Sequence, residues 1–284
     1  MGGTQLVENR RQIHAWERAA LAELRTGDPE TAFDIYRDRG RVYHAQDSER
    51  VREQLVDDWW TARARKPDSI MIASRRADVD DLNHRARHRL ATAKRLGPDE
   101  LIACGRAFAV GDEVLAARND YQLGILNGTR ATITRIDHAT ETIHARRGCA
   151  SHEIVFPRGY AGGGYLTHAY AMTFHKAQGM TATESFVLGD DTLDRQRAYT
   201  GLSRGTHRNA LYIESSGQTN EEQHAPSAVN DAVARARLAL ARTLAKSMAT
   251  DQVEPSRGPA TAPTRGAPSR PPPAPPDLGP DLGL

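Results

Sequence analysis

Apolar residues recur at helical spacing through the first third of the chain. This spacing predicts helices over 13–24, 29–39, 48–59 and 79–90. Ile13 is expected on the apolar face of the first helix, which Gly27 ends, and Asp78 is the expected N-cap of the fourth. Residues 41–44 are expected to form a short strand. Ser69 to Ser74 form a continuous apolar run too short for a helix, which predicts a buried central strand.

Residues 170–214 alternate strand-like and helix-like patterns in quick succession. An apolar run from Tyr170 leads into a polar loop, and further apolar runs at 185–188 and 209–214 flank a helical pattern at 195–203. Strand, loop, helix and strand in this order are typical of a parallel α/β sheet with helices on its faces. Because ligands of such sheets bind at the carboxyl ends of strands, we expect the polar residues of this stretch to lie there.

Between Gly97 and Gly164 the pattern changes to short β-runs. We expect strands at 108–115, 129–136, 142–145 and 153–156. The second of these follows Asn127-Gly128, a pair typical of tight hairpin turns. The pattern therefore predicts a small β-barrel that interrupts the α/β domain.

The C-terminal quarter differs again in composition. Residues 216–225 are polar and are expected to be a linker, and residues 227–249 carry a helical apolar stripe that requires a partner. That partner is either the core of this chain or another chain. Ten of the fifteen prolines follow residue 250, which predicts a disordered tail or tether.

Charge and cysteine content narrow the picture only slightly. The net charge is +2, but with four lysines among 38 basic residues the positive charge is carried mainly by arginine. Arginine suits phosphate binding, and a GC-rich genome would give the same bias. Two cysteines are too few for a disulfide framework or a four-ligand zinc site. No window is apolar enough to span a membrane, and we expect a cytoplasmic protein.

A metal site is not predicted. His84 and His88 have the i, i+4 spacing that can hold a metal ion, but no third ligand accompanies them in the sequence. We therefore expect a solvated helix face at these positions.

Two motifs in the 170–214 stretch carry a family resemblance. Thr-Phe-His-Lys-Ala-Gln-Gly-Met-Thr at 173–181, followed by Ala-Tyr-Thr-Gly-Leu-Ser-Arg ending at Arg204, resembles motifs five and six of superfamily 1 DNA helicases. The most similar branch is that of RecD and the conjugative relaxase-helicases of the TraI, TrwC and TraA (MobF) type. Glu-Asn-Arg-Arg-Gln at 8–12 is similar to motif four of this branch. The alternative is that Thr173 and His175 only cap a helix and Arg204 forms a surface ion pair.

The resemblance implies a fold and a domain order. It implies a RecA-like second motor domain formed by residues 1–94 and 165–216, interrupted at 95–164 by a small Src-homology-3-like barrel. A linker and amphipathic helix at 217–249 and a proline-rich tail at 250–284 complete the expected organisation.

The resemblance also implies roles for individual residues. Arg204 and Arg11 would neutralise charge on the terminal phosphate of ATP, with Arg10 as the competing assignment for Arg11. The residues at positions that couple nucleotide to DNA are Gln178, Gly179 and Thr181. The residues at positions that contact DNA are Thr173, His175, Lys176, Arg118 and Asn119. Thr181 departs from the glutamate of many superfamily 1 helicases. Arg130 and Arg135 are further candidates for phosphate contacts, or are scattered surface charge.

The printed sequence contains no phosphate-binding loop of the Gly-x-x-x-x-Gly-Lys-Ser/Thr type. ATP and Mg²⁺ are therefore expected only together with a first motor domain, and the chain is not expected to hydrolyse ATP alone. The function that follows is the carboxy-terminal half of an ATP-dependent DNA helicase, with single-stranded DNA and a first motor domain as partners. The alternatives are a non-catalytic single-strand-binding module and a truncated remnant of a relaxase-helicase.

Overall fold

The structure is a computed structural model that describes residues 11–45, 47–148, 153–214 and residues 233, 234, 236, 237 and 240. The chain groups into one compact unit that ends at Lys246 and a second unit, 247–284, which lies outside the described residues. The linker and tail expected at 216–225 and after residue 250 also lie outside them.

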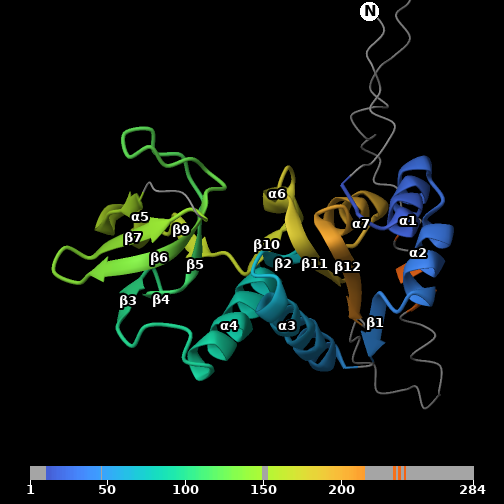
Figure 1. The fold of residues 1–284 in the computed structure, drawn as a ribbon, viewed down its shortest axis with the longest axis horizontal. Coiled ribbons are helices and arrows are strands. Elements are labelled where there is room, and N and C mark those ends of the chain that lie inside the picture. The colour runs from blue at the N-terminus through green and yellow to red at the C-terminus, as the bar shows by residue number, and fades with distance from the viewer. Residues whose placement is uncertain are drawn as a thin grey trace, which may run out of the picture. The chain divides into compact units, whose positions relative to one another are not determined.

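A five-stranded parallel sheet, with strand order β1-β12-β11-β2-β10, confirms the predicted α/β fold (Figure 1). Its strands are β1 Val42–Ala45, β2 Ser69–Ala73, β10 Ala171–Thr173, β11 Ala182–Gly189 and β12 Gly205–Glu214. The strand expected at 69–74 is β2. It lies between β11 and β10, and all of its residues are buried, as a continuous apolar run requires.

Helices cover both faces of this sheet (Figure 1). They are α1 Ala15–Thr26, α2 Pro29–Asp38, α3 Ser48–Arg65, α4 Arg76–Thr92, α6 Phe174–Ala177 and α7 Arg195–Leu202. Side chains of β2 alternate between two cores: Ile70 and Ile72 pack with residues of α1, α2 and α7, whereas Met71 and Ala73 pack with residues of α3 and α4. The sheet is therefore buried on both sides.

Two helix starts differ from the prediction. The helix α4 begins at Arg76 with Arg75 as its N-cap, so Asp78 lies in the first turn and is not the cap. There the buried Asp78 carboxylate accepts a 2.7 Å hydrogen bond from Arg52. Its negative charge also interacts favourably with the positive end of the helix dipole. Ile13 is 57% exposed and precedes α1, so it is not on the buried face of that helix.

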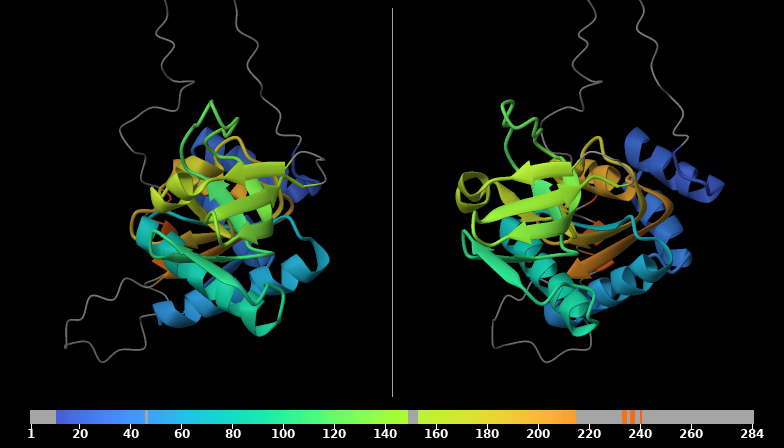
Figure 2. Two further views of the ribbon diagram at one scale, coloured as in Figure 1. Left: turned by 90° about the vertical axis from the view of Figure 1, so that its left-hand side faces the viewer. Right: turned by 60° about the vertical axis from the view of Figure 1, so that its left-hand side comes forward.

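The described residues of 97–148 and 153–168 form mainly antiparallel strands, which face the viewer in the left panel of Figure 2. One hairpin pairs β3 Glu100–Ala103 with β4 Arg106–Ala109. A five-stranded sheet has the order β8-β7-β6-β5-β9, from β5 Glu113–Ala116, β6 Arg130–Asp137, β7 Thr142–Arg146, β8 Glu153–Phe156 and β9 Leu166–His168. A short helix, α5 Arg158–Gly162, precedes β9. Barrel closure, likeness to a Src-homology-3 fold and the domain limits at 95 and 164 stay predictions.

The strand expected at 108–115 is broken into β4 and β5 at Gly111. Gly111 has a φ of +94°, and a Cβ there would lie 2.7 Å from the carbonyl oxygen of Arg95. Only glycine is comfortable in this left-handed, crowded position, so the chain turns at Gly111 and the apolar run divides between two sheets.

Polar contacts tie the antiparallel sheet to the parallel one. The Tyr170 hydroxyl, just before β10, donates to Asp112 at 2.7 Å and accepts from the Glu113 amide at 3.2 Å. The Glu113 carboxylate pairs with Arg63 of α3 at 2.6 Å and with Arg130 of β6 at 2.8 Å. These partners come from both parts of the chain, so β5 is fixed against the end of α3 and the start of β10.

The predicted C-terminal helix is helical at all of its described positions. Ala236 and Leu240 are buried in the core shared by α1 and α2, and Arg237 stacks 5.7 Å from the ring centre of Phe33. At these positions the apolar stripe is therefore covered by the core of this chain. None of the helices in the described part of the chain is long and apolar enough to cross a membrane.

Close packing of α7 on β11 depends on Gly201, which gives a test of the fold. Gly201→Val should lower the free energy of unfolding by about 2–3 kcal/mol in urea titrations, because an added Cβ would lie 2.7 Å from Val187 Cγ2 and 2.9 Å from Phe174 Cε1. The matched control is Gly162→Val in α5, where the added Cβ would meet no atom within 4 Å beyond its chain neighbours and its own helix backbone. Equal losses in the two variants would contradict this packing.

Candidate functional site

The segment after β10 runs from the carboxyl ends of the parallel strands to their amino ends. β10 ends at Thr173, and β11, which runs parallel to it with β2 between them, begins at Ala182. Parallel strands begin at the edge opposite to the one where they end, so residues 178–181 approach the amino end of β11. The Ala182 amide donates to the carbonyl of Arg204, which directly precedes β12. The expectation that this stretch lies at carboxyl ends holds for Thr173 and is wrong for residues 178–181 and Arg204.

Arg204 is buried, with 8% of its surface exposed. Its guanidinium donates to the carbonyls of Thr200 at 2.8 Å, Met180 at 3.2 Å and Ala177 at 3.5 Å, and to the Ser203 hydroxyl at 2.6 Å. All of these acceptors are neutral, so the charge of Arg204 is not cancelled by them. The alternative of a surface ion pair at this position is wrong.

Arg11 lies beside Arg204, although the two are at opposite ends of the described sequence. Arg11 Nη1 donates to the carbonyl of Ser203 at 3.0 Å. Burial, with the charge of Arg11 as the second cause, lowers the pKa of Arg204 to about 10. The arginines expected from motifs four and six are thus brought together, whereas Arg10 lies outside the described residues.

Gln12 fastens the Arg11 segment to the turn that carries Arg204. Its side chain is 1% exposed, and Nε2 donates to the carbonyls of Ser203 at 3.1 Å and Gly205 at 2.9 Å. The Ile13 amide adds a 2.9 Å bond to the carbonyl of Thr206. Sequence reasoning did not single out Gln12. The available signal was its place at the end of Arg-Arg-Gln.

The turn at Gly205 leaves no room for a side chain. A Cβ there would lie 2.6 Å from Asn209 Oδ1 and 3.0 Å from the amide nitrogen of Ser185. The Gly205 amide donates to the same Asn209 oxygen at 2.7 Å. This close approach fixes the backbone from which Arg204 projects.

The loop between β10 and β11 exposes most of the residues that the resemblance assigns to coupling and DNA contact. Thr173 caps α6, since its hydroxyl accepts from the Lys176 amide at 3.4 Å. His175, Gln178, Gly179 and Thr181 are exposed. The Arg204 guanidinium joins this loop to α7, because its carbonyl partners Ala177 and Met180 belong to the loop and Thr200 to the helix.

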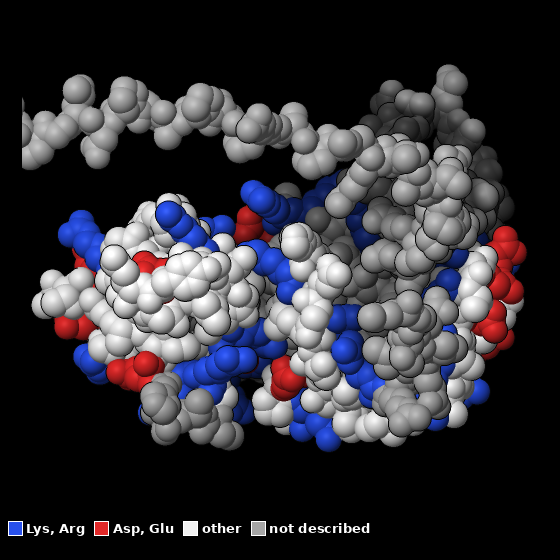
Figure 3. Space-filling view, turned by 90° about the horizontal axis from the view of Figure 1, so that it is seen from above, with Lys and Arg blue, Asp and Glu red and all other residues white. Residues whose placement is uncertain are grey.

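Lys176 lies in a basic cluster with Arg76 and Arg106. Burial, helped by the charges of Arg76 and Arg106, lowers the pKa of Lys176, while Asp80 opposes the shift. Arg76 starts α4 and Arg106 starts β4, so the cluster draws on three separate elements. Figure 3, a view from above, shows Lys and Arg side chains gathered across the middle of the face that it presents.

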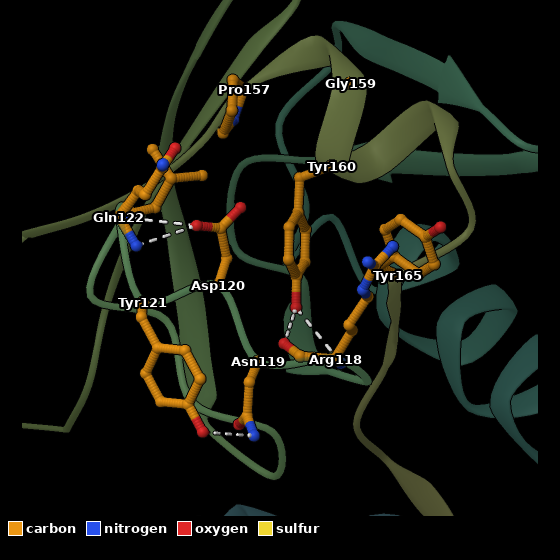
Figure 4. Close-up of a pocket in the computed structure, with 10 residues that line it drawn as sticks. Arg118, Asn119, Asp120, Tyr121, Gln122, Pro157, Gly159, Tyr160 and Tyr165 are labelled. Atoms are coloured by element: carbon orange, nitrogen blue, oxygen red, sulfur yellow. Dashed lines mark hydrogen bonds between the residues drawn. The ribbon is translucent and has the colours of Figure 1, made fainter. Parts of the chain in front are cut away.

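Arg118 and Asn119 begin a loop that borders a groove of about 480 Å³ (Figure 4). The groove is lined by Arg118, Asn119, Asp120, Tyr121, Gln122, Leu123, Pro157, Gly159, Tyr160 and Tyr165. The guanidinium carbon of Arg118 lies 4.6 Å from the ring centre of Tyr165, and the Tyr160 hydroxyl donates to the Arg118 carbonyl at 2.6 Å. Tyr121 is 79% exposed, and its hydroxyl accepts from Asn119 Nδ2 at 3.2 Å. Aromatic rings and a cation thus share one concave surface.

Four other candidate residues have different surroundings. Arg130 pairs with Asp68 and Glu113, and Arg135 faces the ring of His144, so neither lies in the basic cluster. His84 and His88 line a pocket between α3 and α4 that Arg85 and Arg89 also line. Within the described ranges, no three His, Cys, Asp or Glu side chains gather closely enough to hold a metal ion.

Solved structures with similar folds include Pif1 proteins. Bacteroides Pif1 bound to ssDNA is 18% identical with a TM-score of 0.43, covering 72% of this chain and 50% of that one. Pif1 helicase from Candida albicans is 16% identical with a TM-score of 0.44, covering 76% of this chain and 56% of that one. Likenesses this weak add nothing to what the strand order already shows about the fold.

Sequence comparison gives a closer relationship. No protein-family model matches the chain. The conjugal transfer protein TraA of Agrobacterium fabrum is 29% identical over 223 residues, and a probable conjugal transfer protein TraA of Sinorhizobium fredii is 30% identical over 219 residues. Each match covers 75% of this chain and 19% of the relative, so the chain spans about a fifth of the length of these proteins. The resemblance drawn from the motifs is confirmed to this extent: the chain is homologous to part of the TraA conjugal transfer proteins.

Proposed function

We propose that this chain is the second motor half of an ATP-dependent DNA helicase of the conjugative relaxase type. In this proposal Arg204 and Arg11 face the terminal phosphate of ATP from across a cleft whose other wall belongs to a first motor domain. Homology to TraA supports the family, and the juxtaposed arginines are the observation that carries the proposal.

The electrostatics of the pair favour an anionic ligand. The charge of Arg11 is close enough to lower the pKa of Arg204, and the neutral acceptors of Arg204 do not offset this repulsion. A phosphate that accepts from both would relieve that repulsion in a site where little water competes. Since hydrogen bonds already hold both side chains in place, they would need little rearrangement when charge develops on the phosphoryl group.

The first motor domain would hold ATP and Mg²⁺, and the reaction would be the transfer of the γ-phosphoryl group to water. The contribution of this chain is to place two cations against that group and to link them to the DNA-facing loop. Arg204 donates to the carbonyls of Ala177 and Met180, which lie within the 173–181 loop. Because Arg204 is bonded to this loop, its contact with a phosphate would be linked to the position of Gln178, Gly179 and Thr181, the residues assigned to coupling.

Single-stranded DNA is the proposed second ligand. The cluster of Lys176, Arg76 and Arg106 offers positive charge for the backbone, and the exposed His175 ring offers a hydrogen bond. The groove beside Arg118 and Tyr165 offers aromatic faces and a cation, the combination on which bases of single strands stack. In this proposal Asn119 orients the exposed Tyr121 ring through its hydrogen bond.

A non-catalytic single-strand-binding module is the second candidate, and a truncated remnant would keep the same surfaces. The groove and the basic cluster favour it, because both are complete without any nucleotide. Single-strand binding that neither ATP nor an added first motor domain changes would favour this candidate.

The arginine pair gives the main test. In the chain co-expressed with, or fused to, a TraA-type first motor domain, Arg204→Lys and Arg11→Ala should each lower DNA-stimulated ATP hydrolysis about 10³-fold, the usual effect of removing an arginine finger. The rate is measured by phosphate release at saturating DNA. Arg37→Ala is the matched control, because Arg37 lies on α2 and pairs with Asp34 and Asp38 on the surface.

Arg11→Ala keeps this test decisive if Arg204→Lys unfolds the protein. An unchanged rate in folded Arg11→Ala would overturn the proposed role of the pair.

The basic cluster predicts a salt effect on DNA binding. Lys176→Ala and Arg106→Ala should each reduce the slope of log affinity against log salt by about 0.7, the value for one phosphate contact with a single strand. Binding of labelled oligo-dT is followed by fluorescence anisotropy over a KCl series. Arg135→Ala is the control, since this arginine faces His144. Identical slopes in all variants would place the DNA path elsewhere.

A further inference from the structure

A buried carboxylate lies next to the turn that carries the arginine pair. Glu17 of α1 is fully buried, and its Oε1 accepts from the Asn209 amide at 3.1 Å, from Asn209 Nδ2 at 2.9 Å and from the Tyr36 hydroxyl at 3.4 Å. Its Oε2 has no hydrogen-bond partner among the described residues. Burial of a carboxylate costs folding free energy unless its hydrogen bonds stabilise the fold or position the site.

Asn209 connects this carboxylate to Gly205. The Asn209 side chain is fully buried, its Oδ1 accepts from the Gly205 amide at 2.7 Å, and its Nδ2 donates to the Gly205 carbonyl at 3.0 Å. One side chain thus satisfies both backbone groups of Gly205. It does so where β12 carries an extra residue, since Ala182 pairs with Gly205 and Glu184 with Arg208.

From Gly205 the bonds continue to both arginines. The Gly205 carbonyl also accepts from Gln12 Nε2, and the same nitrogen donates to the Ser203 carbonyl. That carbonyl accepts from Arg11, and the Ser203 hydroxyl accepts from Arg204. Glu17 is therefore linked to Arg11 and Arg204 by one continuous set of hydrogen bonds.

We propose that Glu17 and Asn209 are positioning residues for Arg11 and Arg204, and that ionised Glu17 holds them more firmly than protonated Glu17 does. The ionised carboxylate is the stronger acceptor for the two Asn209 N–H groups, so it holds Asn209 and, through it, Gly205. The positions of the arginines are a property of this chain alone. Only the consequence for ATP hydrolysis rests on the proposed function.

Several charged and titratable groups face Glu17. They are Tyr36 of α2, Arg41 just before β1 and, around Arg41, Arg208 and Tyr212 of β12 and Glu184 of β11. Burial raises the pKa of Glu17 to about 7, opposed by the Asn209 bonds and by the charge of Arg41. The change of state therefore falls near neutral pH.

The sign of the stability effect follows from this shift. In the unfolded chain Glu17 loses its proton near the ordinary value of 4.5, whereas in the fold it keeps the proton up to about 7. Its contribution to folding stability is thus fully present below pH 4.5 and is lost as pH rises to about 7. The hold on the arginines is expected to tighten as pH rises through about 7, where Glu17 loses its proton in the fold.

The test uses the full chain and nuclear magnetic resonance of arginine Nε–H groups between pH 5.5 and 8.5. The Arg204 Nε–H, which donates to Thr200, should shift with a midpoint near 7 in the wild type and stay constant in Glu17→Gln. In Asn209→Ala the Gly205 amide should exchange with solvent about 10- to 100-fold faster, because a buried hydrogen bond is lost.

The control is Trp59→Phe on the opposite face of the sheet. It removes a buried 3.0 Å bond from the Trp59 indole to the Ser69 carbonyl, so it should lower stability without moving the Arg204 resonance. The pH series of Glu17→Gln decides the question if Asn209→Ala does not fold. An Arg204 resonance that titrates equally in Glu17→Gln and the wild type would overturn the proposal.

A second readout separates this proposal from the proposed function. In the complex with a first motor domain, kcat should fall several-fold below pH 7 in the wild type with little change in KM, and Glu17→Gln should remove that acid limb. If the resonances respond but Arg204→Lys leaves hydrolysis unchanged, the positioning stands and the proposed function fails. If Arg204→Lys abolishes hydrolysis but the resonances ignore Glu17, the reverse holds.

Discussion

The described fold around the site depends on one interaction, the burial of a charged guanidinium against backbone carbonyls. Arg204 reaches three carbonyl oxygens from two segments of chain, and these bonds make its burial tolerable. The same bonds join the loop after β10 to the end of α7. Removing the side chain would take one donor from each of these carbonyls, although Ala177 and Thr200 would keep bonds from the Met180 amide and the Ser203 hydroxyl. The local backbone and the cation therefore stabilise each other.

The parallel sheet makes this arrangement possible because it brings chain segments distant in sequence to one edge. β11 and β12 begin side by side, and the 11–13 segment lies along the start of β12 through bonds from Gln12 and Ile13. Burial of apolar residues on both faces of the sheet contributes the folding free energy that offsets the cost of burying polar groups at the ends of its strands. The edge itself contains buried polar side chains that hold one another, as Asn209 and Glu17 do.

Much of the fold could be predicted from sequence, because its strands and helices are written in local patterns. The succession of strand-like and helix-like patterns at 170–214 predicted the parallel sheet, and the apolar run at Ser69 and the helical stripes added a central strand and the covering helices. Gln12 was missed because a polar residue beside two arginines has the same local pattern as a charged helix start. The wrong edge for Arg204 has a similar cause, since spacing along the chain does not show on which side of a sheet a connection ends. Gly111 split an apolar run that periodicity alone could not divide.

The contact between Tyr170 and the antiparallel sheet has a mechanical consequence. Its hydroxyl is held by Asp112 and by the Glu113 amide, and three residues later the chain reaches Thr173 at the start of the exposed loop. A displacement of that loop along the strand axis would be transmitted to β5, because β10 and the Tyr170 ring connect the loop to Asp112 and Glu113. The parallel sheet and the antiparallel sheet are therefore mechanically coupled. Strain applied at the loop is shared with the antiparallel sheet, because the connection between the two sheets is not flexible.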